Sequence, residues 1–175
     1  IVNVDDETFA FLEDVLDEVM AIFPSEYIHV GGDEALKAQW EASPRIQSRM
    51  KELGLADEHA LQSYFIQRIE KHLNAKGRRL IGWDEILEGG RAPNATVMSW
   101  RGLEGAVVAA KQGHDTVLAP GPVLYFDHRQ STSPDEPPGR GKMSTLKTVY
   151  AFDADPSELT PEQHKHVLGV QATLF

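Results

Sequence analysis

The chain has 175 residues, a formal net charge of −10, and apolar and charged shares of 41% and 25%. This length allows one domain with a substantial hydrophobic core, and both shares are ordinary for a globular protein. The acidic balance argues against nucleic acid as a partner, because phosphate binding requires a basic surface. The absence of cysteine excludes disulfides and thiolate metal sites and leaves the redox compartment undecided. No apolar run reaches membrane-spanning length.

Helix and strand signals alternate along the chain. Ser43 and Pro44 predict the start of a helix that ends at Gly54, and Asp57 can cap a longer helix that ends before Gly77. The expected elements, in chain order, are a helix over about 5–23, a strand over 27–30, helices over 44–53 and 58–76, strands over 79–83 and 96–100, a helix over 103–112, and strands over 116–119 and 167–174. The polar, Pro- and Gly-rich residues 129–142 predict a surface loop within one domain.

These patterns indicate the fold class. Five expected strands, separated mainly by helices, are typical of a parallel α/β protein. The strands are near-continuous apolar runs, as expected when both faces of a sheet are covered. The sequence therefore predicts an α/β fold with a parallel sheet.

One stretch, from Tyr27 to Glu34, ends in a pair of acids. Apolar residues lead into Gly31 and Gly32, which remove side chains where the strand ends and allow another group to approach the backbone. Neighbouring side chains in extended backbone point to opposite faces, so Asp33 and Glu34 are expected to have different roles. Carboxylates at the carboxyl end of a strand predict an acid/base active site. Alternatively, the two acids only cap a helix that the pattern places directly after Glu34.

Three aromatic residues, Trp83, Trp100 and Tyr125, each end or follow an expected strand. In a barrel the carboxyl ends of the strands converge on one face, where these rings would meet Asp33 and Glu34. Flat aromatic faces suit a sugar ring, and acids together with aromatics predict a carbohydrate pocket. The alternative is that the rings only fill the core, as large aromatic residues commonly do.

Four motifs resemble those of one enzyme family. The string from His29 to Glu34 (His-Val-Gly-Gly-Asp-Glu) resembles the signature of the family 20 glycoside hydrolases, the β-N-acetylhexosaminidases. The segments Gly82–Glu85, Ser99–Gly102 and Tyr125–Asp127 resemble the same family in the same order. The resemblance extends over essentially the whole chain.

The resemblance implies a (β/α)8 barrel of the TIM type, of which this chain supplies about the last five strands. Residues 1–175 would then be the C-terminal portion of a single catalytic domain with no internal boundary. The first three strand–helix units are expected upstream of Ile1, so that the chain is part of a longer protein. An unclosed parallel sheet leaves an edge exposed, and the chain alone is therefore expected to be marginal or prone to association. Catalysis by the isolated chain is expected to be poor, because a half-built barrel does not hold the site residues within the tolerance that a site requires.

The resemblance also implies hydrolysis of terminal β-linked N-acetylglucosamine or N-acetylgalactosamine by retaining, substrate-assisted catalysis. Glu34 is expected to protonate the leaving glycosidic oxygen and later to deprotonate water, while the 2-acetamido oxygen of the substrate attacks the anomeric carbon. Asp33 is expected to orient that acetamide group and to stabilise the oxazolinium intermediate. A glycan or chitooligosaccharide is the implied partner, and no cofactor or metal is implied.

The remaining site residues also follow from the resemblance. Tyr125 resembles the tyrosine that donates to the acetamide carbonyl, Trp83 and Trp100 resemble the walls of the acetamido pocket, and Asp127 resembles an acceptor for a sugar hydroxyl. Phe175 stands where the family usually has a tryptophan beneath the sugar, and a phenylalanine still stacks but has no N–H group. The arginine that grips sugar hydroxyls in the family belongs to the part expected upstream.

Two other functions remain open from the sequence. The chain could be a carbohydrate-binding remnant without turnover, because its sugar-binding set is incomplete. It could also be a metal-assisted hydrolase that uses His29 with Asp33 and Glu34, although His29 inside a strand is expected to make a structural hydrogen bond. A secreted or periplasmic location is favoured only by the family resemblance, and the sequence does not indicate an oligomeric state.

Overall fold

The computed structural model describes every residue of the chain except Ile1, Arg91 and Phe175. Phe175, the expected floor of the sugar site, therefore lies outside the described residues. The chain divides into two compact units, residues 1–96 and residues 97–175. Among the described residues, no helix combines the length and the apolar character that crossing a membrane requires.

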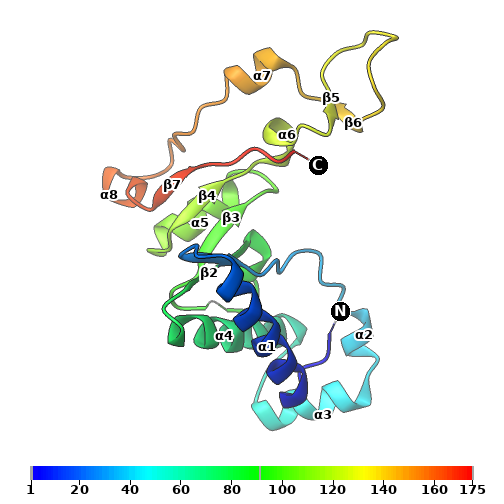
Figure 1. Cartoon of the computed structure of the whole chain (residues 1–175), viewed down its shortest axis with the longest axis vertical. Coiled ribbons are helices and arrows are strands. Elements are labelled where there is room, and N and C mark those ends of the chain that lie inside the picture. Colours follow the sequence, from blue (N-terminus) through cyan, green and yellow to red (C-terminus); the bar gives the residue numbers. More distant parts are fainter. Residues whose placement is uncertain (1, 91, 175) are drawn as a thin grey trace. The chain divides into compact units, whose positions relative to one another are not determined.

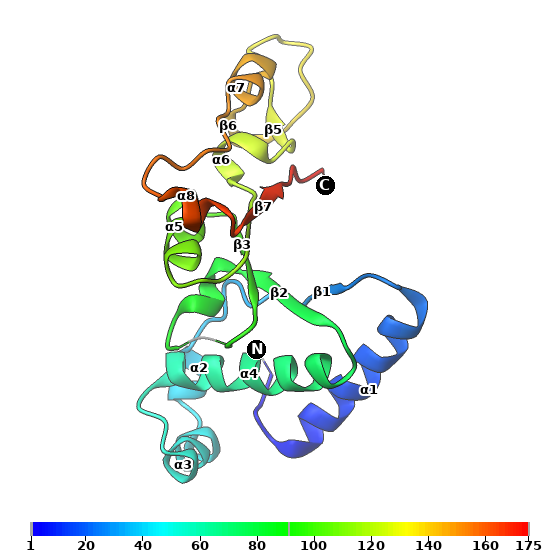
Figure 2. The same ribbon diagram turned by 90° about the vertical axis from the view of Figure 1, so that its left-hand side faces the viewer.

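In the first unit two parallel strands are packed on helices. β1 pairs with β2 so that Ile28 lies opposite Leu80, α4 packs against β2, and α1 packs against α4 (Figure 1). Figure 2 shows α1 and α4 from the side, with β1 and β2 above them. The elements of this unit are α1 (Asp6–Ile22), β1 (Tyr27–His29), α2 (Ala38–Glu41), α3 (Pro44–Leu53), α4 (Glu58–Ala75), β2 (Arg79–Trp83) and the 3-10 helix η1 (Asp84–Leu87).

The capping residues place the helices of the first unit as predicted. The Ser43 hydroxyl accepts a hydrogen bond from the Ile46 N–H at 3.4 Å, and the Asp57 carboxylate accepts one from the Ala60 N–H at 2.8 Å. Gly54 ends α3 in the left-handed conformation, with φ of +67°. The N–H groups of a first helical turn have no partner within the helix, and a side-chain oxygen at the N-cap accepts from one of them. The start of these helices can therefore be predicted from the sequence.

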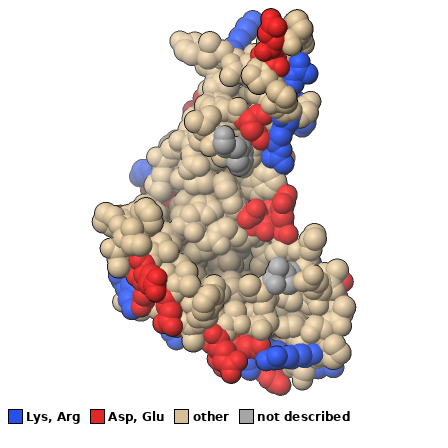
Figure 3. Space-filling view, turned by 45° about the vertical axis from the view of Figure 1, so that its right-hand side comes forward, with Lys and Arg blue, Asp and Glu red and all other residues tan. Residues whose placement is uncertain are grey.

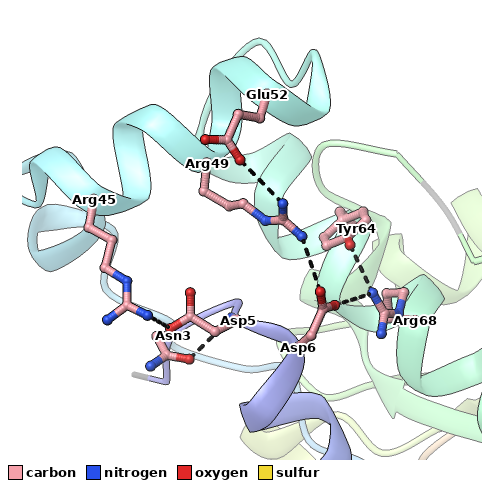
Figure 4. Close-up of polar contacts among 8 residues, drawn as sticks. All are labelled: Asn3, Asp5, Asp6, Arg45, Arg49, Glu52, Tyr64 and Arg68. Carbon is pink, nitrogen blue, oxygen red and sulfur yellow. Dashed lines mark hydrogen bonds and ion pairs between the residues drawn. The ribbon is translucent and has the colours of Figure 1, made fainter.

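Asp5 occupies the N-cap position of α1, but its side chain makes no capping hydrogen bond. It lies instead 2.6 Å from the Arg45 guanidinium of α3, while the neighbouring Asp6 carboxylate lies 3.1 Å from Arg68 of α4 and 3.8 Å from Arg49 of α3. Figure 4 shows this network of acids and arginines around the start of α1. Ion pairs of this partly exposed kind contribute at most about 1 kcal/mol each, so the network adds little to the free energy of unfolding.

The helix predicted over about 5–23 ends one residue before Phe23. Phe9 is completely buried, against the Phe65 ring at 5.1 Å between ring centres. Phe23 is 59% exposed. Phe23 is the C-cap residue in extended backbone, so the 3.6-residue period no longer applies to it.

A cluster of charged residues on α1 and α4 makes stability depend on pH. Asp17 accepts hydrogen bonds from the Lys76 ammonium at 2.6 Å and the His72 ring at 2.8 Å. These bonds, that from Lys76 first, lower the pKa of Asp17 below its usual value. A carboxylate with a lowered pKa stabilises the fold above its usual pKa, near 4, and that contribution is lost as the pH falls through the folded-state value.

We therefore expect Asp17→Asn to lower the melting temperature at pH 7, with a difference from the parent chain that disappears toward pH 2. Melting curves followed by circular dichroism between pH 2 and 7 measure this. Asp14→Asn, an exposed position on the same helix, is the matched control. A melting-temperature difference for Asp17→Asn that persists unchanged at pH 2 would contradict the role of these bonds.

The second unit contains three parallel strands in the order β3–β4–β7. Val97 lies opposite Thr116 in the β3–β4 pair, and the buried Thr116 hydroxyl donates to the Val97 carbonyl at 2.8 Å. α5 packs against β4 (Figure 1). The elements are β3 (Thr96–Ser99), α5 (Glu104–Lys111), β4 (Thr116–Leu118), α6 (Gly121–Leu124), β5 (His128–Arg129), β6 (Arg140–Met143), α7 (Leu146–Tyr150), α8 (Pro161–His164) and β7 (Val167–Val170).

The predicted strands of this unit are confirmed, although β7 ends four residues earlier than the 167–174 run predicts. Beyond it the chain continues beside the segment after β4, because the Phe126 N–H donates to the Thr173 carbonyl at 2.9 Å. The predicted polar loop is largely exposed, and its two ends pair as β5 and β6. This pairing fixes the loop at its base.

Candidate active site

The carboxyl ends of β1 and β2 meet in the first unit. The Val30 N–H donates to the Ile81 carbonyl at 3.0 Å, and the Trp83 N–H donates to the Gly31 carbonyl at 2.9 Å. The backbone that leads to Asp33 is therefore hydrogen-bonded directly to Trp83, the first of the predicted aromatic residues. Within this unit, the strand end that carries the acids and the strand end that carries Trp83 lie side by side.

Gly32 shows why the motif needs a residue without a side chain. Its φ is +97°, a conformation that L side chains rarely adopt, and a Cβ there would lie 2.6 Å from Cγ2 of Ile86 in η1. The close approach predicted for these glycines is therefore made by η1. Gly31, with φ of +73°, begins the same sharp turn.

Asp33 and Glu34 lie on this turn, and both side chains are exposed. Glu34 has φ of +47° and is the one non-glycine residue with positive φ in the described part of the chain. The prediction of a helix directly after Glu34 is wrong, because α2 begins at Ala38 and its N-cap is Lys37. The acids are therefore not the cap of a helix, and Glu34 has a backbone conformation that is uncommon for a residue with a side chain.

His29 has a structural role in this turn. Its Nδ1 accepts a hydrogen bond from the Gly31 N–H at 3.1 Å, and its ring meets the Trp83 ring edge-on at 4.8 Å. Desolvation lowers the pKa of His29, while the Asp33 carboxylate acts in the opposite direction. The predicted structural hydrogen bond is confirmed, and within the described residues no three His, Cys, Asp or Glu side chains are grouped as a metal ion requires.

Gln62 of α4 also holds the turn, and the sequence patterns did not single it out. Its side-chain amide donates to the Gly32 carbonyl at 2.8 Å and its oxygen accepts from the Lys37 ammonium. Lys37 donates in addition to the Ala35 carbonyl at 2.8 Å. Gln62 is 4% exposed. The one signal for it in the sequence was its position as a polar residue directly after the apolar Leu61, because a buried polar side chain needs a hydrogen-bond partner.

In the second unit Trp100 and Tyr125 form a stacked pair. Their ring centres are 6.4 Å apart and the ring planes differ by 18°. The Gly121 N–H donates to the Trp100 carbonyl at 2.8 Å, so α6 starts beside Trp100 and ends directly before Tyr125. The structure thus brings two of the predicted aromatics together through a helical turn that the sequence did not predict.

Asp127 follows Tyr125 and has an unpaired oxygen. Its Oδ1 is buried and has no hydrogen-bond partner among the described residues, whereas Oδ2 lies 3.7 Å from Arg140 Nε. A buried carboxylate oxygen without a donor is costly, and most such oxygens in proteins are bonded.

A cavity of about 410 Å³ adjoins the stacked pair, which is within the range of small-molecule pockets. Its lining residues all belong to the second unit: Trp100, Arg101, Gly121, Pro122, Tyr125, His128, Arg140, Gly141 and Lys142. The predicted site residues are thus divided between the two units. Asp33, Glu34 and Trp83 lie in the first unit, and Trp100, Tyr125 and Asp127 lie in the second.

Comparison with known proteins agrees with these motifs. The sequence profile of "Glycosyl hydrolase family 20, catalytic domain" matches residues 1–175. A beta-hexosaminidase of Porphyromonas gingivalis is 52% identical over 171 residues, which are 97% of this chain and 22% of that protein. A beta-hexosaminidase of Vibrio furnissii is 37% identical over 172 residues, 96% of this chain and 28% of that protein. The chain thus spans about a quarter of the length of these relatives.

Solved structures show the same likeness. The exo-β-N-acetylglucosaminidase of Vibrio harveyi in complex with N-acetylglucosamine matches with a TM-score of 0.86 and 31% identity, over 97% of this chain and 27% of that one. The chitobiase of Flavobacterium johnsoniae matches with a TM-score of 0.80 and 31% identity, over 98% and 25%. These structures are TIM-type barrels, and this chain has the fold of part of such a barrel. The chain belongs to glycosyl hydrolase family 20.

Proposed function

We propose that the chain carries catalytic residues of a β-N-acetylhexosaminidase, which releases terminal β-linked N-acetylglucosamine or N-acetylgalactosamine from glycans. The exposed Asp33–Glu34 pair on its strained turn is the observation that carries this proposal. The names of the relatives support it. We further propose that residues 1–175 supply about the last five strands of one barrel domain without an internal boundary.

The adjacency of the two acids favours a substrate-assisted route. Glycosidases with a protein nucleophile place two carboxyl groups about 5 Å apart on opposite sides of the bond, and neighbouring residues on one turn do not flank a sugar in that way. In the proposed first step Glu34 protonates the glycosidic oxygen as the bond from the anomeric carbon breaks. The acetamido oxygen of the substrate forms the new bond to that carbon and gives an oxazolinium ion.

In the second step water attacks the anomeric carbon, Glu34 takes the proton of that water, and the bond to the acetamido oxygen breaks. Two displacements at one carbon give overall retention of configuration. Asp33 accepts a hydrogen bond from the acetamide N–H and balances the positive charge of the intermediate.

The aromatic residues and Asp127 are proposed to bind the sugar. Trp83 and Trp100 enclose the acetamido group, and the Tyr125 hydroxyl donates to its carbonyl. Asp127 is proposed to accept a hydrogen bond from a sugar hydroxyl. Phe175 is proposed to stack beneath the ring.

The acetamido group itself provides the test. An aryl β-N-acetylglucosaminide should be hydrolysed roughly a thousandfold faster than the matching aryl β-glucoside, because only the former carries the intramolecular nucleophile. Rates of aryl release under identical conditions, with circular dichroism of the same samples, measure this. Equal cleavage of both sugars would contradict substrate assistance. A folded chain that binds N-acetylglucosamine without cleaving it would instead be a carbohydrate-binding module.

A further inference from the structure

Asp33 and Glu34 depend on the backbone of their turn for their position. Both side chains are exposed, and neither takes part in a hydrogen bond or an ion pair within the described residues. A left-handed φ such as the +47° of Glu34 is costly for a residue with a side chain, and it persists only where the surrounding structure enforces it. The contacts that hold the backbone on either side of the acids therefore decide where their carboxyl groups lie.

Lys37 and Gln62 make such contacts on both sides of the acid pair. The Gln62 amide donates to the Gly32 carbonyl, directly before the acids, at 2.8 Å. The Lys37 ammonium donates to the Ala35 carbonyl, directly after the acids, at 2.8 Å. It also donates to the side-chain oxygen of Gln62, so that three linked hydrogen bonds span the acid pair. We call Lys37 and Gln62 the clamp.

Both members of the clamp are anchored in the first unit. Gln62 belongs to α4, the long helix, and is 4% exposed. The Lys37 ammonium lies 5.8 Å from the centre of the Trp40 ring in α2, a distance at which an aromatic face attracts a cation. Trp40 is itself buried, and its indole N–H donates to the Val2 carbonyl at 3.0 Å. The clamp therefore joins the turn to two packed helices.

Lys37 is unlike an ordinary surface lysine. Figure 3 shows Lys and Arg side chains on the surface, several of them next to Asp or Glu side chains. The Lys37 side chain is half-buried and bonds to uncharged oxygens. Desolvation lowers the pKa of Lys37, while Glu88 and Glu85 act in the opposite direction. Withdrawing a cation from water is costly, and the two hydrogen bonds and the aromatic face offset that cost here.

We propose that Lys37 and Gln62 are positioning residues that hold the Glu34 carboxyl group within reach of the glycosidic oxygen. This inference rests on the proposed function, because it takes Glu34 as the proton donor. Both residues act through the carbonyls that flank the acids and not through contact with the substrate. A displacement of about 1 Å can lower a rate about a hundredfold. Loosening the turn is therefore expected to lower kcat, while KM, which depends on contacts with the sugar, changes little.

Two variants test this through kinetics. Gln62→Met removes both hydrogen bonds of Gln62 and keeps the length of the side chain, and Lys37→Met does the same for Lys37. Each should lower kcat for an aryl β-N-acetylglucosaminide about tenfold, with KM changed less than about twofold. Lys37→Arg keeps the charge and the donors and should restore most of the rate.

The leaving group separates positioning from general damage to the fold. The loss in kcat should be smaller for an aryl group whose phenol is more acidic, because such a group depends less on the proton donor. A variant that is merely destabilised loses the same fraction of activity with every leaving group. Gln67→Met and Lys71→Met make the same exchanges at exposed positions of α4, and we expect both to have parental kinetics.

The order of the turn is measured without catalysis. Nuclear magnetic relaxation of the Asp33 and Glu34 amide nitrogens gives order parameters, which are about 0.85 in rigid backbone and below about 0.6 in flexible backbone. We expect the parent chain and the two controls near the rigid value and both clamp variants, Gln62→Met and Lys37→Met, near the flexible one. The remaining amide signals show whether each variant is folded. Lys37→Met, at a half-buried position, provides the test if Gln62→Met does not fold.

Parental order parameters in the folded clamp variants, parental kcat values, or an equal loss with every leaving group would overturn the inference. Hydrolysis by a parent chain whose clamp variants keep a rigid turn would refute the inference and leave the proposed function standing. A loss of order at the acids in the clamp variants of a chain that hydrolyses no substrate would support the hold on the turn and contradict the proposed activity.

Discussion

Replacing Glu34 by Gln should lower kcat/KM for an aryl β-N-acetylglucosaminide by about 10²- to 10⁴-fold, the usual contribution of a general acid. Glutamine keeps the size of the side chain and its place on the turn but has no proton to donate to the leaving oxygen. The loss should be smaller for an aryl group whose phenol is more acidic, because such a group leaves without protonation. Initial rates for a series of aryl substrates measure both effects.

Glu41→Gln is the matched control for this experiment. Glu41 is exposed in α2, close in sequence to the acid pair, and its replacement makes the same change in charge and shape. We expect its kinetics to equal those of the parent chain. A Glu34→Gln variant with parental rates and an unchanged circular dichroism spectrum would refute Glu34 as the acid.

Gly89→Ala should have the largest effect on the stability of the first unit, lowering the free energy of unfolding by about 3 kcal/mol. Gly89 has φ of +73°, and a Cβ there would lie 2.1 Å from the carbonyl carbon and oxygen of His59. These are backbone atoms at the start of α4, so they cannot rotate away as a side chain would. Urea unfolding followed by circular dichroism measures the change.

Gly54→Ala separates the two causes of this effect. Gly54 also has a positive φ, of +67°, but no atom lies within 4 Å of the Cβ position. Only the backbone strain remains there, and we expect a loss of about 1 kcal/mol. Equal losses at both positions would show that the contact with His59 contributes nothing.

The sequence predicts those features that local chemistry determines. Ser43 and Asp57 mark helix starts because their side chains accept hydrogen bonds from N–H groups of the first turn. Gly54 marks a helix end because a residue without a side chain readily adopts the left-handed conformation found there. The strands β2 and β4 are apolar runs between turn residues and are found where predicted. The family motifs likewise identify the fold, because the profile of the family to which they belong matches residues 1–175.

The sequence does not predict features that depend on packing. The left-handed φ of Glu34 and the start of α2 at Ala38 have no signal in the local sequence. The close approach of Ile86 to Gly32 in the same turn joins residues more than fifty positions apart. The short helix α6 begins at Gly121, directly after Pro120, and these two residues locally indicate only a break. Phe23 matches the helical period, but the helix has already ended there.

The candidate site shows the same division. Asp33 and Glu34 were recognisable from an unusual string, and Trp100 and Tyr125 from their places after strands. Gln62 was not, because a hydrogen bond to the Gly32 carbonyl joins residues thirty positions apart. Arg140 and Lys142 were not recognisable either, because charges in a polar loop look like ordinary solvated ones, although the structure places both in the lining of a cavity.

The left-handed backbone at Glu34 means that a substitution which raises thermostability at this position is expected to lower the proposed catalytic activity. An L residue with a side chain costs about 1 kcal/mol in this conformation, and glycine would remove that cost. Glu34→Gly is thus a substitution that a screen for heat resistance alone would reward and a screen for catalysis would reject. Laboratory evolution of this chain therefore needs selection on activity at every round, because stabilising changes would otherwise accumulate first at the proposed proton donor.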